Sequence, residues 1–95
     1  MLPHVTQSAR ISVKLVNKWG LHARTAFVLA SAAMGYRADI QIEKEGITAD
    51  AKRMDQLLLL IAEAGDVLRI TATGADGPEA VKNIAGIIRS GFGEE

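Results

Sequence analysis

Residues 10–34 read RISVKLVNKWGLHARTAFVLASAAM, and this stretch decides the fold. Its first seven residues alternate between polar and apolar side chains, with Ile11, Val13 and Leu15 on one face, and this alternation predicts a half-buried strand. Over 23–34 the apolar side chains instead recur at the spacing of a helix. A strand should therefore pass through a short loop directly into a helix.

The same two periods predict three further strands and two further helices. The strands are expected at 39–43, 47–50 and 66–73, the first two joined by a hairpin turn. The helices are expected at 54–64 and at 78–90. The order βαββαβα and the apolar stripes of the helices predict an α+β fold. We expect a two-layer, open-faced β-sandwich, with a four-stranded, mostly antiparallel sheet covered by three helices on one face.

Length and composition limit what the chain can be. Its 95 residues suffice for one domain over 1–95, in which we expect 1–8 to be a frayed tail. Cysteine is absent and there are two histidines, so we expect no disulfide, metal or cofactor. The longest apolar run, 57–62, is far shorter than the roughly 20 residues that span a bilayer. The first ten residues lack the pattern of a secretory signal, so we expect a cytoplasmic protein without membrane insertion.

The charges are balanced in total but not along the chain. Lys plus Arg and Asp plus Glu both number 11, and aromatic residues are few, so the composition gives no sign of nucleic-acid binding. Residues 1–38 nevertheless carry five basic side chains and no acidic one, whereas all the acidic side chains lie from Asp39 onward. We therefore expect the first third of the chain to bind an anion.

The run Gly20-Leu21-His22-Ala23-Arg24 falls where the first strand gives way to the first helix. Free backbone N–H groups and the helix dipole favour an anion at that point, so a phosphate carried on His22 would meet donors already aimed at it. Arg24 would add a fork-shaped cation. From the residues alone, a His22 that is merely solvated in a polar loop remains the alternative.

The same run resembles the phosphorylation-site motif of the histidine-containing phosphocarrier (HPr) family of the bacterial phosphotransferase system, at the same point between strand and helix. The resemblance covers about residues 10–92, and the ending SGFGEE at 90–95 is similar to the nitrogen-branch carrier NPr. It implies that His22 accepts a phosphoryl group through Nδ1 from phosphohistidine enzyme I and passes it to an enzyme IIA component. The carrier would be a monomer and not itself an enzyme.

The resemblance also implies roles for the neighbouring residues. The phosphate would be bound by Ala23, Arg24 and Thr25, and the partners would dock on Gly20, Phe27, Arg53, Met54 and Leu58. We expect Gly20 to permit the close approach of a partner. Four consecutive leucines at 57–60 cannot all face one core, which suits an exposed docking surface. A core position for Leu58 is the alternative.

Two positions depart from the family pattern. Thr25 stands where the motif usually continues with proline, and it adds an N–H group and a hydroxyl that can contact the phosphate. Arg53 stands where many relatives carry a regulatory serine, so that control is absent at this position. The alternative function is a binding-only regulator that docks on a kinase or a transcription factor; the presence of both His22 and Arg24 argues against it.

Overall fold

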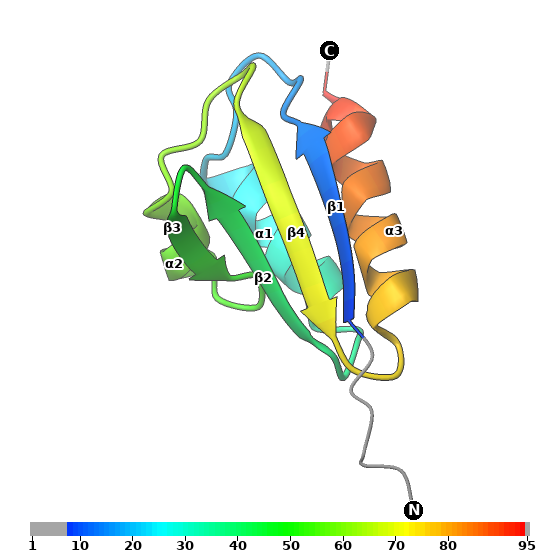
Figure 1. Cartoon of the computed structure of the whole chain (residues 1–95). Coiled ribbons are helices and arrows are strands. Elements are labelled where there is room, and N and C mark those ends of the chain that lie inside the picture. Colours follow the sequence, from blue (N-terminus) through cyan, green and yellow to red (C-terminus); the bar gives the residue numbers. More distant parts are fainter. Residues whose placement is uncertain (1–7, 95) are drawn as a thin grey trace, which may run out of the picture.

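A four-stranded sheet with helices on one face makes up the computed structural model, which describes residues 8–94 (Figure 1). The strands are β1 (Ser8–Lys14), β2 (Asp39–Lys44), β3 (Ile47–Asp50) and β4 (Val67–Thr73). The helices are α1 (Ala23–Ala33), α2 (Met54–Leu58) and α3 (Gly77–Arg89), followed by the short 3₁₀ turn η1 (Gly91–Gly93). The strand order is β1-β4-β2-β3 and each neighbouring pair is antiparallel. The predicted open-faced α+β sandwich is confirmed.

The first residue of the described chain bears on the predicted frayed tail. Ser8 belongs to β1 and pairs with Thr73 of β4, so the predicted frayed tail over 1–8 is wrong at Ser8. The ladder of backbone hydrogen bonds with β4 holds this residue in place. The remainder of the predicted tail, 1–7, lies outside the described residues.

The core lies between the helices and the inner face of the sheet. Ile70 of β4 pairs with Ile11 of β1 on one side and with Ile42 of β2 on the other. Ile70, Ile42 and Leu15, which follows β1 directly, are fully buried, and Val13 of β1 is buried as well. The alternation expected for residues 10–16 is therefore confirmed, and the opposite face of the sheet carries polar side chains to solvent.

Helix α2 is shorter than the predicted 54–64, because it ends at Leu58. Leu57 and Leu60 are buried, but Ile61 is exposed and has a left-handed backbone with φ of 50°. The predicted helical span is therefore wrong beyond Leu58. The chain leaves the helix at this point to reach the loop after β1, where the carbonyl oxygen of Ala62 accepts a hydrogen bond from the Leu21 amide at 2.9 Å.

Lys44 stabilises the point where α2 ends. Its ammonium group donates to the carbonyl oxygens of Leu60 at 3.3 Å and Ile61 at 2.8 Å, and pairs with the Asp66 carboxylate at 3.2 Å. These contacts give hydrogen-bond partners to two carbonyl groups of the segment that follows α2. They also fix the segment that leads from α2 to β4 and packs beside the loop before α1 (Figure 1).

Truncation at the centre of the sheet should destabilise the fold. We expect Ile70→Ala to lower the free energy of unfolding by about 2–5 kcal/mol, because it opens a cavity between β1, β2 and the helices. Val67→Ala, at an exposed position of the same strand, should cost less than about 0.5 kcal/mol. Chemical denaturation followed by circular dichroism measures both. Equal losses for the two variants would contradict this description of the core.

Candidate functional site

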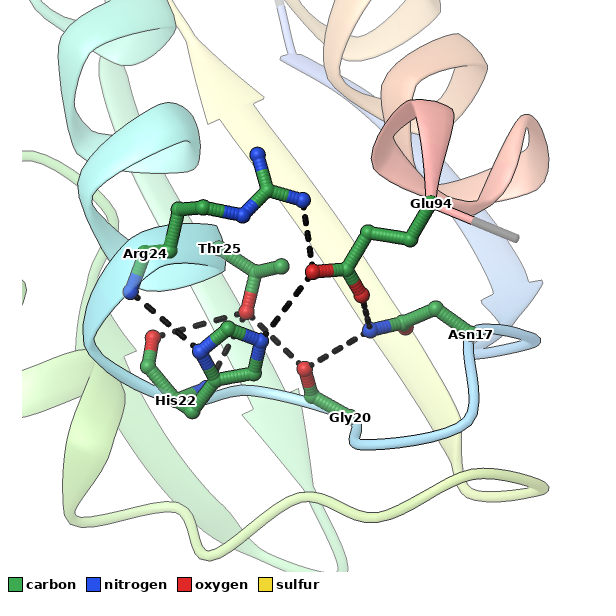
Figure 2. Close-up of polar contacts among 6 residues, drawn as sticks. All are labelled: Asn17, Gly20, His22, Arg24, Thr25 and Glu94. Carbon is green, nitrogen blue, oxygen red and sulfur yellow. Dashed lines mark hydrogen bonds and ion pairs between the residues drawn. The ribbon is translucent and has the colours of Figure 1, made fainter.

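His22 is the N-cap residue of α1, with an extended backbone. Its ring nitrogen Nδ1 accepts a hydrogen bond from the Arg24 amide at 3.3 Å (Figure 2). A ring nitrogen that accepts from an amide carries no proton, so in the neutral ring the proton lies on Nε2. The lone pair of Nδ1 therefore faces the backbone N–H groups at the start of α1, as the position of the motif predicts.

Thr25 closes the same cap from the protein interior. Its hydroxyl accepts a hydrogen bond from the His22 amide at 3.0 Å and donates one to the Gly20 carbonyl oxygen at 2.9 Å (Figure 2). His22 and Thr25 together form a capping box at the start of the helix. The side chain of Thr25 is fully buried in these bonds, so its hydroxyl is not available for the expected contact with a phosphate. The threonine instead holds the loop that a proline would otherwise constrain.

Gly20 has a different role from the one expected. It is buried and has φ of 63°, and a Cβ atom at this position would lie 2.4 Å from the Ala62 carbonyl oxygen. The predicted docking role is therefore corrected: the close approach that Gly20 permits is to the chain's own backbone. A glycine is required both by this contact and by the left-handed conformation.

Glu94 brings a carboxylate into the site from the other end of the described chain (Figure 2). Its Oε2 lies 2.5 Å from Nη2 of Arg24 and 3.3 Å from Nε2 of His22. Its Oε1 accepts a hydrogen bond from the Asn17 side-chain amide at 2.8 Å. The hydrogen bond from Arg24 is the main cause that holds the pKa of the Glu94 carboxyl below its usual value, and the one from Asn17 comes next.

A left-handed turn after α3 delivers Glu94 to this position. Gly91, Phe92 and Gly93 have φ of 71°, 61° and 74°, and the Phe92 side chain is buried in the core. A positive φ is costly for a phenylalanine, so the burial of its ring must hold the turn in place. The turn is thus a fixed part of the fold from which Glu94 reaches the start of α1.

Sequence reasoning missed two residues of the site, Asn17 and Glu94. Asn17 is buried, and its side-chain amide donates to the Gly20 carbonyl oxygen at 2.9 Å as well as to Glu94. Asn17 follows the first strand in the sequence, and nothing there distinguishes it from an ordinary loop residue. For Glu94 a signal existed, because the basic first third of the chain predicted a bound anion, and a side chain of the same chain supplies one.

Apart from Gly20, the residues expected to bind partners lie on two helices that pack against each other: Phe27 on α1, Met54 and Leu58 on α2, and Arg53 at the N-cap of α2. Phe27 is 60% exposed and Leu58 37% exposed, so the core alternative for Leu58 is not supported, while Met54 packs partly against the core. We call Phe27, Arg53, Met54 and Leu58 the helix-edge surface. Arg53 is exposed and its guanidinium pairs with both oxygens of the Asp55 carboxylate, at 3.2 and 3.0 Å. This hydrogen-bonded pair raises the pKa of Arg53 and lowers that of Asp55.

Residues 8–94 contain neither a membrane-spanning helix nor a cluster of metal-binding side chains. No helix in this part of the chain has the length and apolar character needed to cross a membrane. Within the same residues, the carboxylates and the imidazole do not gather in a group of three or more that could hold a metal ion.

Comparisons with known proteins point to one family. The family model described as "PTS HPr component phosphorylation site" matches residues 9–90. The chain is 33% identical over 92 residues to phosphocarrier protein NPr of Proteus mirabilis, which covers 96% of this chain and 100% of NPr. It is 30% identical over 83 residues to phosphocarrier protein HPr of Neisseria meningitidis, with coverages of 87% and 93%. The structure is similar to that of HPr from Thermoanaerobacter tengcongensis, with a TM-score of 0.88 at 33% identity over 92% of this chain and 98% of that chain.

The hydroxyl of Thr25 should prove necessary for the start of α1. We expect Thr25→Val to lower the free energy of unfolding by about 1–3 kcal/mol, because it removes the hydroxyl that accepts from the His22 amide and one of the two hydrogen bonds that the Gly20 carbonyl oxygen accepts. Thr25→Ser keeps the hydroxyl and should cost about 1 kcal/mol or less. Chemical denaturation measures the stabilities, and amide hydrogen exchange at His22 should be faster only in the valine variant. A valine variant as stable as the serine variant would contradict the capping role.

Proposed function

The chain belongs to the HPr family of phosphocarriers of the phosphotransferase system, and from this premise we propose that His22 is its phosphoryl acceptor. His22 would take the phosphoryl group from the phosphohistidine of enzyme I and pass it to an enzyme IIA component, in either sugar uptake or nitrogen regulation. One observation carries the proposal: the lone pair of Nδ1 lies at the N-terminus of α1, among donors aimed at an anion.

The reaction needs no proton to leave the ring. The Nδ1 lone pair attacks phosphorus, and a new N–P bond forms on His22 as the N–P bond on enzyme I breaks. The electron pair of the broken bond returns to the enzyme I ring, which leaves as a neutral imidazole with a proton on its other nitrogen, while the His22 ring keeps its Nε2 proton and becomes positively charged. The Arg24 amide, which now donates to Nδ1, is released by this step and can donate to a phosphoryl oxygen instead. The amides of Ala23 and Thr25, in the same first turn, supply the further donors in this proposal.

Arg24 supplies positive charge next to the reacting nitrogen. Its guanidinium carries five N–H donors, and among residues 8–94 one of its nitrogens, Nη2, contacts Glu94. The side chain is 55% exposed, so it can turn toward a phosphoryl group on Nδ1. Donors of this kind stabilise the charge on a phosphoryl group in transfer, and an exposed arginine does so without trapping the product.

The helix-edge surface is the proposed docking site for both partners. It combines exposed apolar groups with the Arg53–Asp55 pair, and its Phe27 lies on the helix that His22 caps, so we expect a protein bound there to reach His22. Leu59 and Ile61 extend the exposed apolar area at the end of α2. A binding-only regulator would use the same surface, but binding alone does not require that Nδ1 of His22 lie among the donors at the start of α1.

Removal of the ring should abolish phosphoryl uptake without unfolding the protein. We expect His22→Asn, in which a favourable N-cap residue keeps the helix start, to gain no phosphoryl group from phosphoenolpyruvate and enzyme I. His4→Ala removes the only other histidine and should behave as the wild type. Intact-protein mass spectrometry detects one acid-labile phosphoryl group per chain. Arg24→Ala should still be labelled, but about tenfold or more slowly. Labelling of the asparagine variant would refute the proposal for His22.

Truncation of the helix-edge surface should weaken docking rather than chemistry. We expect Phe27→Ala to raise the Kd for enzyme I by about fivefold, because an exposed aromatic anchor is lost. Met34→Ala removes an equally exposed apolar side chain at the far end of α1 and is the matched control. Titration of the fluorescence of Trp19, which is exposed near the site, follows binding. The same Kd for both variants would contradict docking on the helix-edge surface.

A further inference from the structure

Glu94 occupies donors that a phosphoryl group on His22 would use. A single oxygen, Oε2, contacts both the Arg24 guanidinium and the ring nitrogen Nε2 of His22 (Figure 2). The reactive nitrogen Nδ1 is on the same ring, so a phosphoryl group there would bring its negative charge close to this carboxylate. Arg24 would then lie between two anions, the Glu94 carboxylate and the phosphoryl group on His22.

We propose that Glu94 competes with the phosphoryl group for Arg24 and thereby sets how readily His22 gives that group up. The inference rests on the proposed phosphoryl role of His22. In the unphosphorylated protein the Glu94–Arg24 pair is intact. In the phosphorylated protein Arg24 can serve the phosphoryl group only by weakening its bond to Glu94, so the carboxylate raises the free energy of the phosphorylated state. Glu94 is in this sense a positioning residue, because it acts through Arg24.

Glu94 also has an opposing, favourable effect on the phosphorylated state. After Nδ1 has attacked, the ring still carries its Nε2 proton and gains positive charge, which Glu94 would stabilise through its contact with Nε2. That contact is 3.3 Å long, whereas the contact with Arg24 is 2.5 Å. Charged hydrogen bonds are strongest when short, and Arg24 is also the main influence on the titration of Glu94, with His22 the least. The competition for Arg24 should therefore outweigh the support of the ring.

Two features argue that the Glu94 contact is built into the fold. The left-handed turn at 91–93 is held by the buried Phe92 ring, and the buried Asn17 fixes the second carboxylate oxygen at 2.8 Å. The carboxylate is thus held from two sides, by Asn17 and by Arg24. The span matched by the family model ends at residue 90, so Glu94 lies outside it.

The test compares the phosphorylated fraction of wild type and Glu94→Gln at equilibrium with enzyme I and a fixed ratio of phosphoenolpyruvate to pyruvate. We expect the equilibrium constant for phosphoryl uptake to rise about two- to fivefold in the variant, the range for a partly exposed charge pair. Glu79→Gln removes the same charge at the start of α3, far from the site, and should match the wild type. Mass spectrometry of the intact proteins measures the fractions.

A double-mutant cycle identifies the route of the effect. In an Arg24→Gln background, Glu94→Gln should change the equilibrium constant much less, because the shared cation is gone. A purely structural role of Glu94 would lower uptake or leave it unchanged, and either result in the single variant would overturn the inference. An equal rise of the equilibrium constant in the presence and absence of Arg24 would also overturn the inference. If even the wild type took up no phosphoryl group, the proposed function itself would fail.

Discussion

The hydrogen bond from the Arg24 amide to Nδ1 of His22 ties the start of α1 to the reactive ring, and the other features of the site depend on it. It caps the helix, and it requires that Nδ1 carry a lone pair. The side chain that caps the helix is therefore also the side chain that we propose to react. A donor that stabilises the resting ring is already in place for the phosphoryl group that follows.

The bond at Nδ1 needs a rigid loop around it, which several distant segments supply. The Thr25 hydroxyl links the two sides of the cap, and Gly20 lets the loop pack against the backbone of Ala62. That packing explains why α2 ends early, since the chain at 59–62 must leave the helix to meet the loop. The site is in this way connected to the central sheet through short, specific backbone contacts, while His22 itself stays accessible.

Much of the fold and part of the site could be predicted from the sequence. The alternation in 10–16 and the helical spacing in 23–34 are local signals, and they located the junction that holds His22 and Arg24. The end of α2 could not be predicted, because its apolar pattern continues to Ile61 while tertiary contacts stop the helix at Leu58. Glu94 was missed for a related reason. Its contacts join residues about seventy positions apart, and no local pattern contains them.

The most direct test of the central claim is to find which ring nitrogen of His22 carries the phosphoryl group. Nitrogen-15 and phosphorus-31 NMR of the protein, phosphorylated by enzyme I with ¹⁵N-labelled histidine, distinguishes the two positions. The geometry of the cap predicts a phosphorus–nitrogen coupling at Nδ1, with the proton retained on Nε2. Attachment at Nε2, the nitrogen that faces Glu94, would contradict the account of how α1 orients the ring.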